Sequence, residues 1–310
     1  MTTTGSGLPL IGFGLPVSGS WATPQTMRHV AQRAEALGYA SLWSFQRVLF
    51  PAEGDIGPQY RAVHDPVVPL AYVAAVTERI RLGTAIVNAP FLPPAVLGKQ
   101  LTSLDVVSGG RLDAGLGIGW SPDEYAAAGV PMERRGARME EYLQTLVALW
   151  TQDPVVVEGE FYRVPASHVR PLPVQRPHPP LLLGGTADAA LRRAGRLAEG
   201  WISISRQDLT AIGRSVAVVR GGAEQAGRDP AAVRVVVRGL VDLVDAPPAD
   251  RRPLVGTRDQ VLDDLRALAG QGVTEVFLDL NFSPRVGSPD VDPAEALAYA
   301  EQVLEAFAAA

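Results

Sequence analysis

The sequence contains no cysteine. A disulfide framework, a thiolate nucleophile and any zinc or iron–sulfur site held by cysteine are therefore excluded. Histidine is also scarce, because the chain has only His29, His64, His168 and His178. No two of these histidines have the spacing of metal ligands. We therefore expect no metal site.

Excess positive charge and long apolar runs are absent as well. The 310 residues carry a formal net charge of −5, which offers no basic surface for nucleic acid. The longest apolar runs, such as residues 70–76, are far shorter than the ~20 residues that span a membrane. Residues 1–14 lack the basic start and the long apolar core of a signal peptide. These features predict a cytoplasmic globular protein with no nucleic-acid or membrane partner.

The chain does contain a regular alternation of strand-like and helix-like segments. Short apolar segments bounded by glycine or proline alternate with segments that begin at capping residues, such as Thr23 before Pro24. Strands are expected at residues 9–16, 41–45, 80–88, 111–119, 180–184, 201–205, 233–244 and 274–281. Helices are expected at residues 23–37, 65–77, 94–107, 133–151, 188–198, 209–226, 257–269 and 293–307.

This alternation predicts the fold class. Eight strand–helix units in about 300 residues fit an α/β fold of the (β/α)8 TIM-barrel type better than an open doubly wound sheet. Residues 154–180 interrupt the alternation with a hairpin-like run, VVVEGEFYRV, and a proline-rich stretch. We interpret residues 154–180 as an insertion segment. No polar linker divides the chain, so we expect a single domain over residues 1–310.

Barrel geometry indicates where a site would lie. Active sites of this fold lie at the carboxyl ends of the strands. The residues expected there include no histidine or cysteine, and they offer one pair of candidate carboxylates, Asp123 and Asp279. This shortage of acid–base groups favours a bound cofactor as the carrier of the chemistry.

Two neighbouring strand ends are suited to an anion. Gly184, Gly185 and Thr186 lie between a strand and a helix start, where free backbone N–H groups and the helix dipole favour phosphate. After the next strand, Ser205 and Arg206 add a hydroxyl donor and a positive charge. A Gly-Gly turn between a strand and a helix is also common as simple architecture.

Two further segments have alternative interpretations. GLGIGW, at residues 115–120, lacks the dinucleotide-binding spacing. Its glycines either admit a flat ring to the strand end or allow tight packing inside the barrel.

Asp65 is expected to cap a helix. The adjacent His64 is either an acid–base group at the pocket mouth or an exposed loop residue.

Four motifs resemble, in this order, those of the luciferase-like monooxygenase superfamily, and in particular its F420-dependent actinobacterial oxidoreductases. They are SLWSFQRVLFP, HDPVVPLAYVAAVTERIRLGTAIVNAP, SGGRLDAGLGIGWSPDEYAAAG and LLLGGTADAALRRAGRLAEGW. The resemblance, over residues 10–307, implies a TIM barrel that is commonly a homodimer. It implies an enzyme that transfers hydride between coenzyme F420, a deazaflavin, and a small organic substrate. The alternatives are an FMN-dependent monooxygenase that uses reduced flavin and oxygen, and a barrel without catalytic activity.

The resemblance also implies where the cofactor lies. A non-prolyl cis peptide bond or a bulge is expected at Ala85–Ile86, beneath the ring. The implied ring contacts are Phe45, Gln46, Ala85, Ile86, Asn88, Gly119 and Asp123. The implied phosphate and ribityl contacts are Gly184, Gly185, Thr186, Ile204, Ser205 and Arg206.

The chain departs from the resembling enzymes at the end of the second strand. F420-dependent relatives often have an acidic residue followed by histidine there, whereas this chain has Phe45 and Gln46. Glutamine forms hydrogen bonds but does not titrate. Gln46 is therefore expected to orient the ring, and His64 or a solvent molecule to handle the proton. Gln46 and His64 are the candidate catalytic residues.

Overall fold

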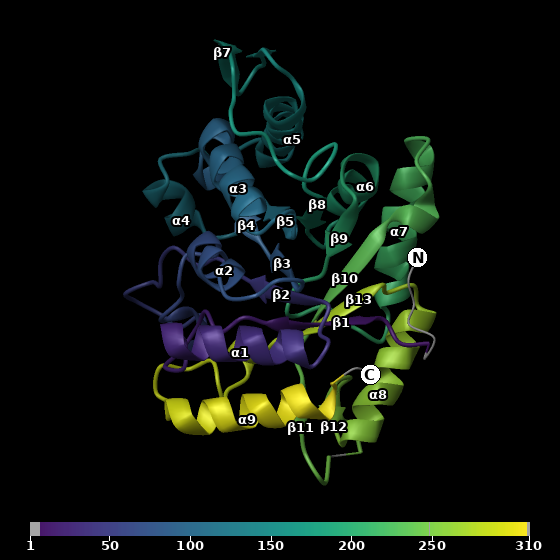
Figure 1. Ribbon diagram of the computed structural model, residues 1–310. Helices are drawn as coiled ribbons and strands as arrows, with labels where there is room; N and C mark the ends of the chain where they lie inside the picture. Colours follow the sequence, from purple (N-terminus) through teal and green to yellow (C-terminus); the bar gives the residue numbers. More distant parts are fainter. Residues whose placement is uncertain (1–6, 248, 309–310) are drawn as a thin grey trace.

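The computed structural model describes residues 7–247 and 249–308 and confirms the TIM barrel (Figure 1). The parallel sheet has the order β3-β2-β1-β13-β10-β9-β8-β5-β4, and it closes because β3 also pairs with β5. β3 and β4 together form one interrupted strand of the barrel. The barrel strands are β1 (Leu10–Gly14), β2 (Ser41–Ser44), β3 (Arg81–Thr84), β4 (Val87–Asn88), β5 (Leu112–Gly117), β8 (Leu181–Gly184), β9 (Gly200–Ile202), β10 (Arg234–Gly239) and β13 (Glu275–Leu278).

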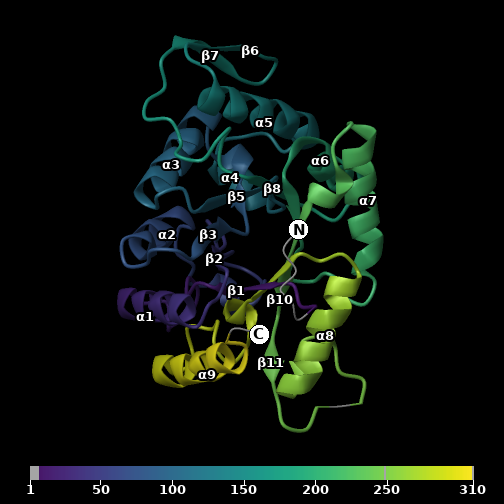
Figure 2. The ribbon, with the colours of Figure 1, turned by 45° about the vertical axis from the view of Figure 1, so that its right-hand side comes forward.

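Helices connect these strands and surround the sheet (Figures 1 and 2). They are α1 (Pro24–Ala36), α2 (Val67–Ala74), α3 (Pro94–Val107), α4 (Pro122–Ala127), α5 (Arg135–Thr151), α6 (Asp188–Leu197), α7 (Ile212–Gln225), α8 (Arg258–Gly270) and α9 (Pro293–Ala306). Short 3-10 turns lie at η1 (Pro58–Tyr60), η2 (Ala89–Phe91), η3 (Pro230–Ala232) and η4 (Leu280–Phe282). Among the described residues, no helix has the length and apolarity that crossing a membrane requires.

Capping residues fix the starts of the first two helices as expected. Thr23 Oγ1 accepts the Thr26 N–H at 3.2 Å at the start of α1. Asp65 Oδ1 accepts the N–H groups of Val67 and Val68 at 2.8 and 3.1 Å at the start of α2. Each acceptor satisfies N–H groups that a helix leaves unpaired in its first turn.

The main differences from the sequence-based expectations concern two strands and two helices. The strand expected at residues 80–88 is interrupted between β3 and β4. The strand expected at residues 233–244 ends at Gly239, and β11 (Asp242–Leu243) leaves the barrel to pair with β12 (Val255–Gly256). The short helix α4 was not expected; the Ser121 side chain accepts the Glu124 N–H at its start. α2 ends at Ala74 instead of residue 77, and buried Arg111 donates hydrogen bonds to the carbonyl oxygens of Ala74 and Thr77.

The insertion forms a hairpin at the edge of the barrel. β6 (Val155–Glu158) and β7 (Arg163–Ser167) pair antiparallel and project beyond α5 (Figure 2). Val155 and Val164 pack against Ala148 and Leu149 of α5, which anchors the hairpin.

The barrel interior has an apolar layer and a charged end. Trp43, Leu182, Ile202, Val236 and Phe277 fill the apolar layer, and the Trp43 and Phe277 rings stack with centroids 5.4 Å apart.

The charged end lies where the strands begin. Fully buried Asp113 accepts hydrogen bonds from Arg81 Nε at 2.8 Å and Arg234 Nη1 at 2.6 Å, and Arg234 Nη2 donates to Glu275 at 3.1 Å. We call Arg81, Asp113, Arg234 and Glu275 the basal cluster. It closes one end of the barrel and leaves the carboxyl ends of the strands for a site.

Candidate functional site

The interrupted strand forms a bulge at the mouth of the barrel. Pairing with β5 passes from Gly83–Asp113 to Val87–Leu116, so four steps along the interrupted strand correspond to three along β5. A surplus residue of this kind defines a β-bulge. The Ala85–Ile86 peptide bond within it is cis. This feature, expected from the family resemblance, is confirmed.

Gln46 connects the bulge to the second strand. Its side-chain oxygen Oε1 accepts the Asn88 N–H at 2.7 Å, and the Ala85 N–H donates to the Ser44 carbonyl at 2.6 Å. The Gln46 amide nitrogen makes no hydrogen bond to the described part of the chain. Because Oε1 is engaged, the group that Gln46 can offer a ligand is an N–H donor.

Arg238, at the end of β10, holds the other side of the bulge. Its Nη2 donates a hydrogen bond to the Ala85 carbonyl oxygen. The side chain is 8% exposed and lies among aromatic rings, 4.7 Å from the Phe282 centroid and 5.4 Å from that of Phe45. Burial lowers the pKa of Arg238, and the nearby Asp279 carboxylate opposes this shift. Arg238 Nε is buried and makes no hydrogen bond.

Asp279 and Asn281 support Arg238 from the end of β13. Asp279 Oδ2 lies 3.4 Å from Arg238 Nε, and Oδ1 accepts the Asn281 N–H at 3.0 Å and its Nδ2 at 2.8 Å. Asn281 Oδ1 in turn accepts the backbone N–H groups of Val17 and Ser18. These bonds fix the Asp279 carboxylate beside the guanidinium. Asp279 is therefore engaged in structure, and no contact joins it to Asp123, which is exposed in the first turn of α4.

The two loops expected to hold phosphate follow adjacent strands, β8 and β9. Gly185 has a φ of +141°, in the region that favours glycine, and its carbonyl accepts the Trp201 Nε1–H at 2.8 Å. Thr186 is exposed, and no side chain caps the start of α6. On the second loop, Ile204 and Arg206 are exposed and Ser205 is half-buried. Phosphate binding by these loops stays a prediction.

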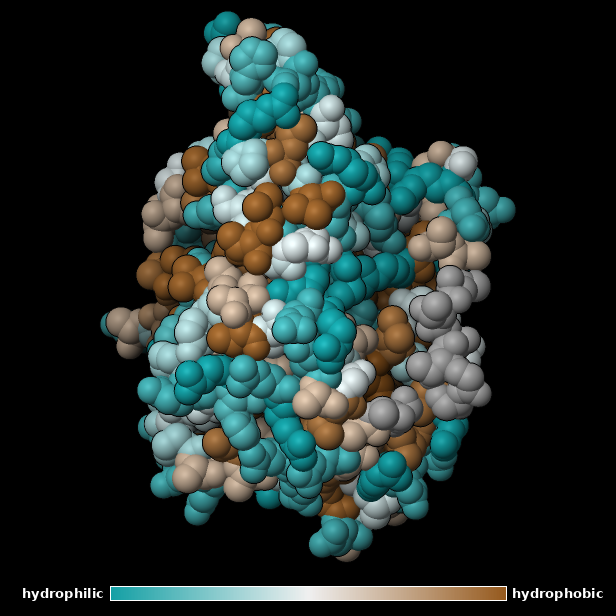
Figure 3. Space-filling view, in the orientation of Figure 1, coloured by the Kyte–Doolittle hydropathy of each residue, from teal (hydrophilic) through white to brown (hydrophobic). Residues whose placement is uncertain are grey.

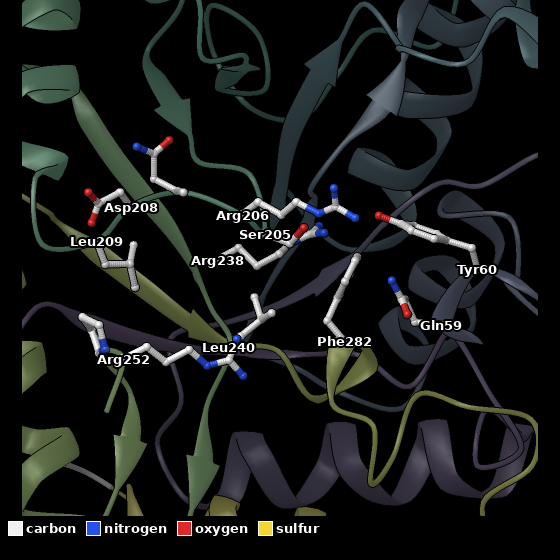
Figure 4. A pocket seen from close by; sticks show the side chains of 12 residues that line it. Gln59, Tyr60, Ser205, Arg206, Asp208, Leu209, Arg238, Leu240, Arg252 and Phe282 are labelled. Atoms are coloured by element: carbon white, nitrogen blue, oxygen red, sulfur yellow. The ribbon is translucent and has the colours of Figure 1, made fainter. Parts of the chain in front are cut away.

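A pocket of about 420 Å³ opens beside the second loop (Figure 4). Figure 4 shows the side chains of Arg206 and Arg238 pointing toward the Tyr60 hydroxyl, while Arg252 reaches in beside Leu240. Its lining residues are Gln59, Tyr60, Ser205, Arg206, Gln207, Asp208, Leu209, Arg238, Leu240, Arg252, Pro253 and Phe282. The lining residues thus include three arginines and one acidic residue, Asp208.

The remaining predicted residues occupy varied positions around the mouth. A Cβ on Gly117 would lie 1.9 Å from Ile86 Cδ1, so this glycine makes room for the Ile86 side chain. Tight packing, one of the two interpretations of GLGIGW, therefore holds at Gly117. The Gly119 carbonyl accepts Arg135 Nη1 at 3.3 Å. Asn88 is buried, and Phe45 packs against Phe282 with ring centroids 5.0 Å apart.

His64 lies outside the lining of this pocket. Its ring is exposed, and Nε2 is 2.9 Å from the Ala22 carbonyl oxygen. This contact joins the loop before α2 to the loop after β1, so the His64 side chain has a structural role. A role for His64 in proton transfer stays a prediction.

Sequence reasoning did not assign Tyr60, Arg252 and Phe282 to the site, and it gave Arg238 no role. Tyr60 and Phe282 come from 3-10 turns, and Arg252 from the segment between β11 and β12. Arg238 alone had a usable signal, because it stands at the carboxyl end of a barrel strand.

The residues at the mouth fit a flat, anionic cofactor. Arg206 lines the pocket and makes no hydrogen bond or ion pair with the described residues, and Arg238 adds a buried guanidinium whose charge is offset by Asp279. Gln46 adds an amide N–H next to the bulge. Unpaired donors of this kind are suited to phosphate and to the polar edge of a ring.

The profile of the luciferase-like monooxygenases matches residues 10–252. The chain belongs to this family. A relative from Mycobacterium tuberculosis H37Rv, the uncharacterized protein Rv0953c, is 35% identical over 262 residues, which cover 83% of this chain and 82% of that protein. A further relative, the FMNH(2)-dependent dimethylsulfone monooxygenase of Pseudomonas putida, is 31% identical over 76% of this chain and 63% of that protein.

Solved structures agree with the fold of this luciferase-like protein. The coenzyme F420-dependent tetrahydromethanopterin reductase of Methanopyrus kandleri superposes with a TM-score of 0.73 at 19% identity, over 94% of this chain and 97% of that one. Monooxygenases are also among the matching structures. Luciferase-like proteins are oxidoreductases or monooxygenases, and the similar proteins include users of both F420 and reduced FMN.

Proposed function

We propose that this luciferase-like protein is an oxidoreductase that transfers hydride between coenzyme F420 and a small organic substrate. The observation that carries the proposal is the pocket beside Ser205 and Arg206, which continues to Arg252 with a volume of about 420 Å³. F420 has a lactyl-glutamate tail beyond its phosphate, whereas FMN ends at its phosphate. A basic, open space beyond the phosphate loops favours F420.

The bulge and its supports would hold the ring. When bound, the deazaflavin supplies a ring carbon that donates or accepts hydride. The Gln46 amide N–H would contact the polar edge of the ring, while Oε1 holds Asn88. Arg238 would keep the Ala85 carbonyl in place beneath it. The Phe45, Tyr60 and Phe282 rings pack together beside Arg238 and would exclude water.

The proposal assigns proton handling to His64 or to a solvent molecule. If His64 carries the proton, His64→Gln alters the pH–rate profile and lowers turnover by ~100-fold or more. If the ring only joins the loop to Ala22, His64→Gln leaves both the pH profile and turnover unchanged. The pH–rate profile of the two proteins separates these outcomes.

The second candidate is a monooxygenase that uses reduced FMN and oxygen. The 31% identity to the Pseudomonas putida enzyme named for FMNH(2) favours it. Equilibrium binding of F420 and FMN to the purified protein, measured side by side by fluorescence, tests the choice. We expect F420 to bind more tightly than FMN. Tight binding of FMN with no binding of F420 overturns the proposal, and binding of neither supports the non-catalytic barrel.

Two variants test the phosphate site in the same assay. Gly185→Asp puts a carboxylate where an anion is expected and should abolish cofactor binding. Arg206→Ala should weaken binding by about ten- to a hundredfold, because a hydrogen bond to a charged group contributes about 1.5–3 kcal/mol. Unchanged affinity in both variants would place the phosphate elsewhere. Circular dichroism confirms that each variant is folded.

We also propose that the enzyme acts as a cytoplasmic homodimer. Exposed apolar side chains gather on two helices, Val68 and Tyr72 on α2 and Val96 and Val107 on α3. Hydrophobic residues are prominent in this region, on the left of Figure 3. A second copy could cover such a surface through a twofold, self-complementary contact. Light scattering should give twice the chain mass, and Tyr72→Glu should give the monomer.

A further inference from the structure

Almost every arginine in this chain has a partner. Of its 27 arginines, all but three make a side-chain hydrogen bond, ion pair or ring contact within the described residues. The three exceptions are Arg28, Arg206 and Arg252. Arg28 lies exposed on α1, whereas Arg206 and Arg252 line the same pocket.

The charges around this pocket do not cancel. Arg238 faces Asp279 at 3.4 Å, which leaves Asp208 as the carboxylate among the lining residues. Asp208 Oδ1 already accepts the N–H of Thr210 at 2.9 Å and its hydroxyl at 2.6 Å. No ion pair joins Asp208 to Arg206 or Arg252. Two unpaired guanidinium groups therefore line one cavity of a chain whose net charge is −5.

The wall around Arg252 is apolar on one side. Leu240, Pro253 and Phe282 line the pocket with it, and Figure 4 shows its guanidinium lying beside Leu240. Arg238 lines the same cavity, but its guanidinium is paired with Asp279. A guanidinium beside an apolar wall matches a ligand that carries both an anionic group and carbon atoms. Among organic anions, a carboxylate matches the two parallel N–H groups of arginine.

We propose that Arg252 forms a second anion subsite in this pocket, which binds a carboxylate of an organic ligand. The carboxylate belongs either to the tail of the cofactor or to the substrate. That the subsite is a second one rests on the proposed function, in which Ser205 and Arg206 bind the phosphate of the cofactor.

The test compares Arg252→Ala and Arg252→Lys with the native protein, and Arg28→Ala serves as the matched control. Arg28 is also exposed and unpaired but lies outside the pocket. The probes are F420, FMN, and the pair 4-phenylbutyrate and its neutral amide. Binding is measured by calorimetry at low and at high salt. Arg28→Ala should bind every probe like the native protein.

The two sources give different results. If the carboxylate is in the cofactor tail, Arg252→Ala weakens F420 binding by about ten- to a hundredfold and leaves FMN binding unchanged. If the carboxylate belongs to the substrate, both cofactors bind normally, and 4-phenylbutyrate but not its amide loses affinity by a similar factor. In either case Arg252→Lys restores part of the affinity, and salt weakens what remains.

The inference is overturned if Arg252→Ala binds F420, FMN and 4-phenylbutyrate as the native protein does. It is also overturned if the amide binds as well as the acid and F420 binding is unaffected. Failure of the proposed function gives a different set of binding results. In that event the native protein binds no F420, while the loss of 4-phenylbutyrate binding in Arg252→Ala still supports the subsite.

Discussion

Arg238 joins three parts of the barrel mouth through one side chain. Its Nη2 bonds the Ala85 carbonyl of the bulge, its Nε lies 3.4 Å from Asp279 on β13, and its guanidinium packs against the Phe282 ring. Removing one partner of a buried charge pair leaves the other charge without compensation. The residue therefore affects stability as well as the shape of the site.

Arg238→Ala should lower the free energy of unfolding by about 3–5 kcal/mol, because Asp279 becomes an unpaired buried carboxylate. Urea denaturation at neutral pH measures this change. Arg252→Ala is the control, since that side chain is exposed and has no partner among the described residues, and its unfolding midpoint should stay within error of the native value. Equal midpoints for the two variants would show that the Arg238–Asp279 pair contributes little.

Gln46 should act on binding more than on turnover. Gln46→Ala removes the acceptor of the Asn88 N–H, so the bulge loses a support and cofactor affinity should fall about tenfold, or about 1.4 kcal/mol. Gln46→Glu retains an acceptor oxygen and should preserve more of the unfolding free energy than Gln46→Ala. Fluorescence titration and denaturation measure the two quantities. A fall in turnover with unchanged affinity would assign Gln46 to the chemical step instead.

At the scale of single elements, the start of α8 gives a clean test of capping. Thr257 Oγ1 accepts the Gln260 N–H at 3.4 Å, and Gln260 Oε1 accepts the Thr257 N–H at 3.0 Å. Thr257→Ala loses the first bond and should cost about 1 kcal/mol of stability. Thr257→Ser keeps the hydroxyl group and should cost less. Thermal unfolding of both variants checks the order.

Elements with strong local signals could be predicted from the sequence. Thr23 before Pro24 and Asp65 before Pro66 marked helix starts that depend on nearby residues alone. The short helix α4 has the same kind of start, Ser121 before Pro122, but its six residues are too few for a helical apolar pattern, and Glu124 bonds to Val48 and Leu49 far along the chain. β11 leaves the barrel because it pairs with β12, and no local sequence pattern predicts this pairing.

The residues of the candidate site also fall into those that the sequence predicted and those that it did not. The Ala85–Ile86 bulge was expected because the chain resembles a known family there, whereas Gly185 was already indicated by its place between a strand and a helix start. Arg252 was not expected, since its position beside Arg206 arises from folding of the segment between β11 and β12 onto the mouth. The hydrogen bond from Asn88 to Gln46 also joins residues whose proximity only the closed sheet creates.

At the scale of the whole molecule, the basal cluster ties strands from around the barrel together. Burial by itself raises the pKa of Asp113, but Arg234 and Arg81 outweigh it and hold the pKa below its ordinary value. Asp113→Asn should therefore destabilise the fold by about 3–5 kcal/mol at neutral pH, because two arginines lose their shared carboxylate. Chemical denaturation measures the difference, and a surface variant such as Asp259→Asn is the control.

The same carboxylate gives the stability a defined pH dependence. A carboxyl group whose pKa is lowered by folding stabilises the native state fully above its unfolded pKa of about 3.9, and this stabilisation is lost as the pH falls through the lower folded value. The native protein should therefore lose stability below about pH 4 more steeply than Asp113→Asn. Denaturation series between pH 6 and pH 3, as rough limits around that pKa, compare the slopes. Parallel slopes would contradict the assignment.

Closure of one end by the basal cluster also constrains how ligands exchange. A packed interior and a sealed base leave the mouth as the route to Ala85 among the described residues. Under the proposed function, cofactor and substrate would share this opening, and a ligand that enters second would cover one that is bound deeper. If one ligand covers the other in this way, binding is ordered and release follows the reverse order. A high concentration of the second ligand should therefore trap the first and slow its dissociation.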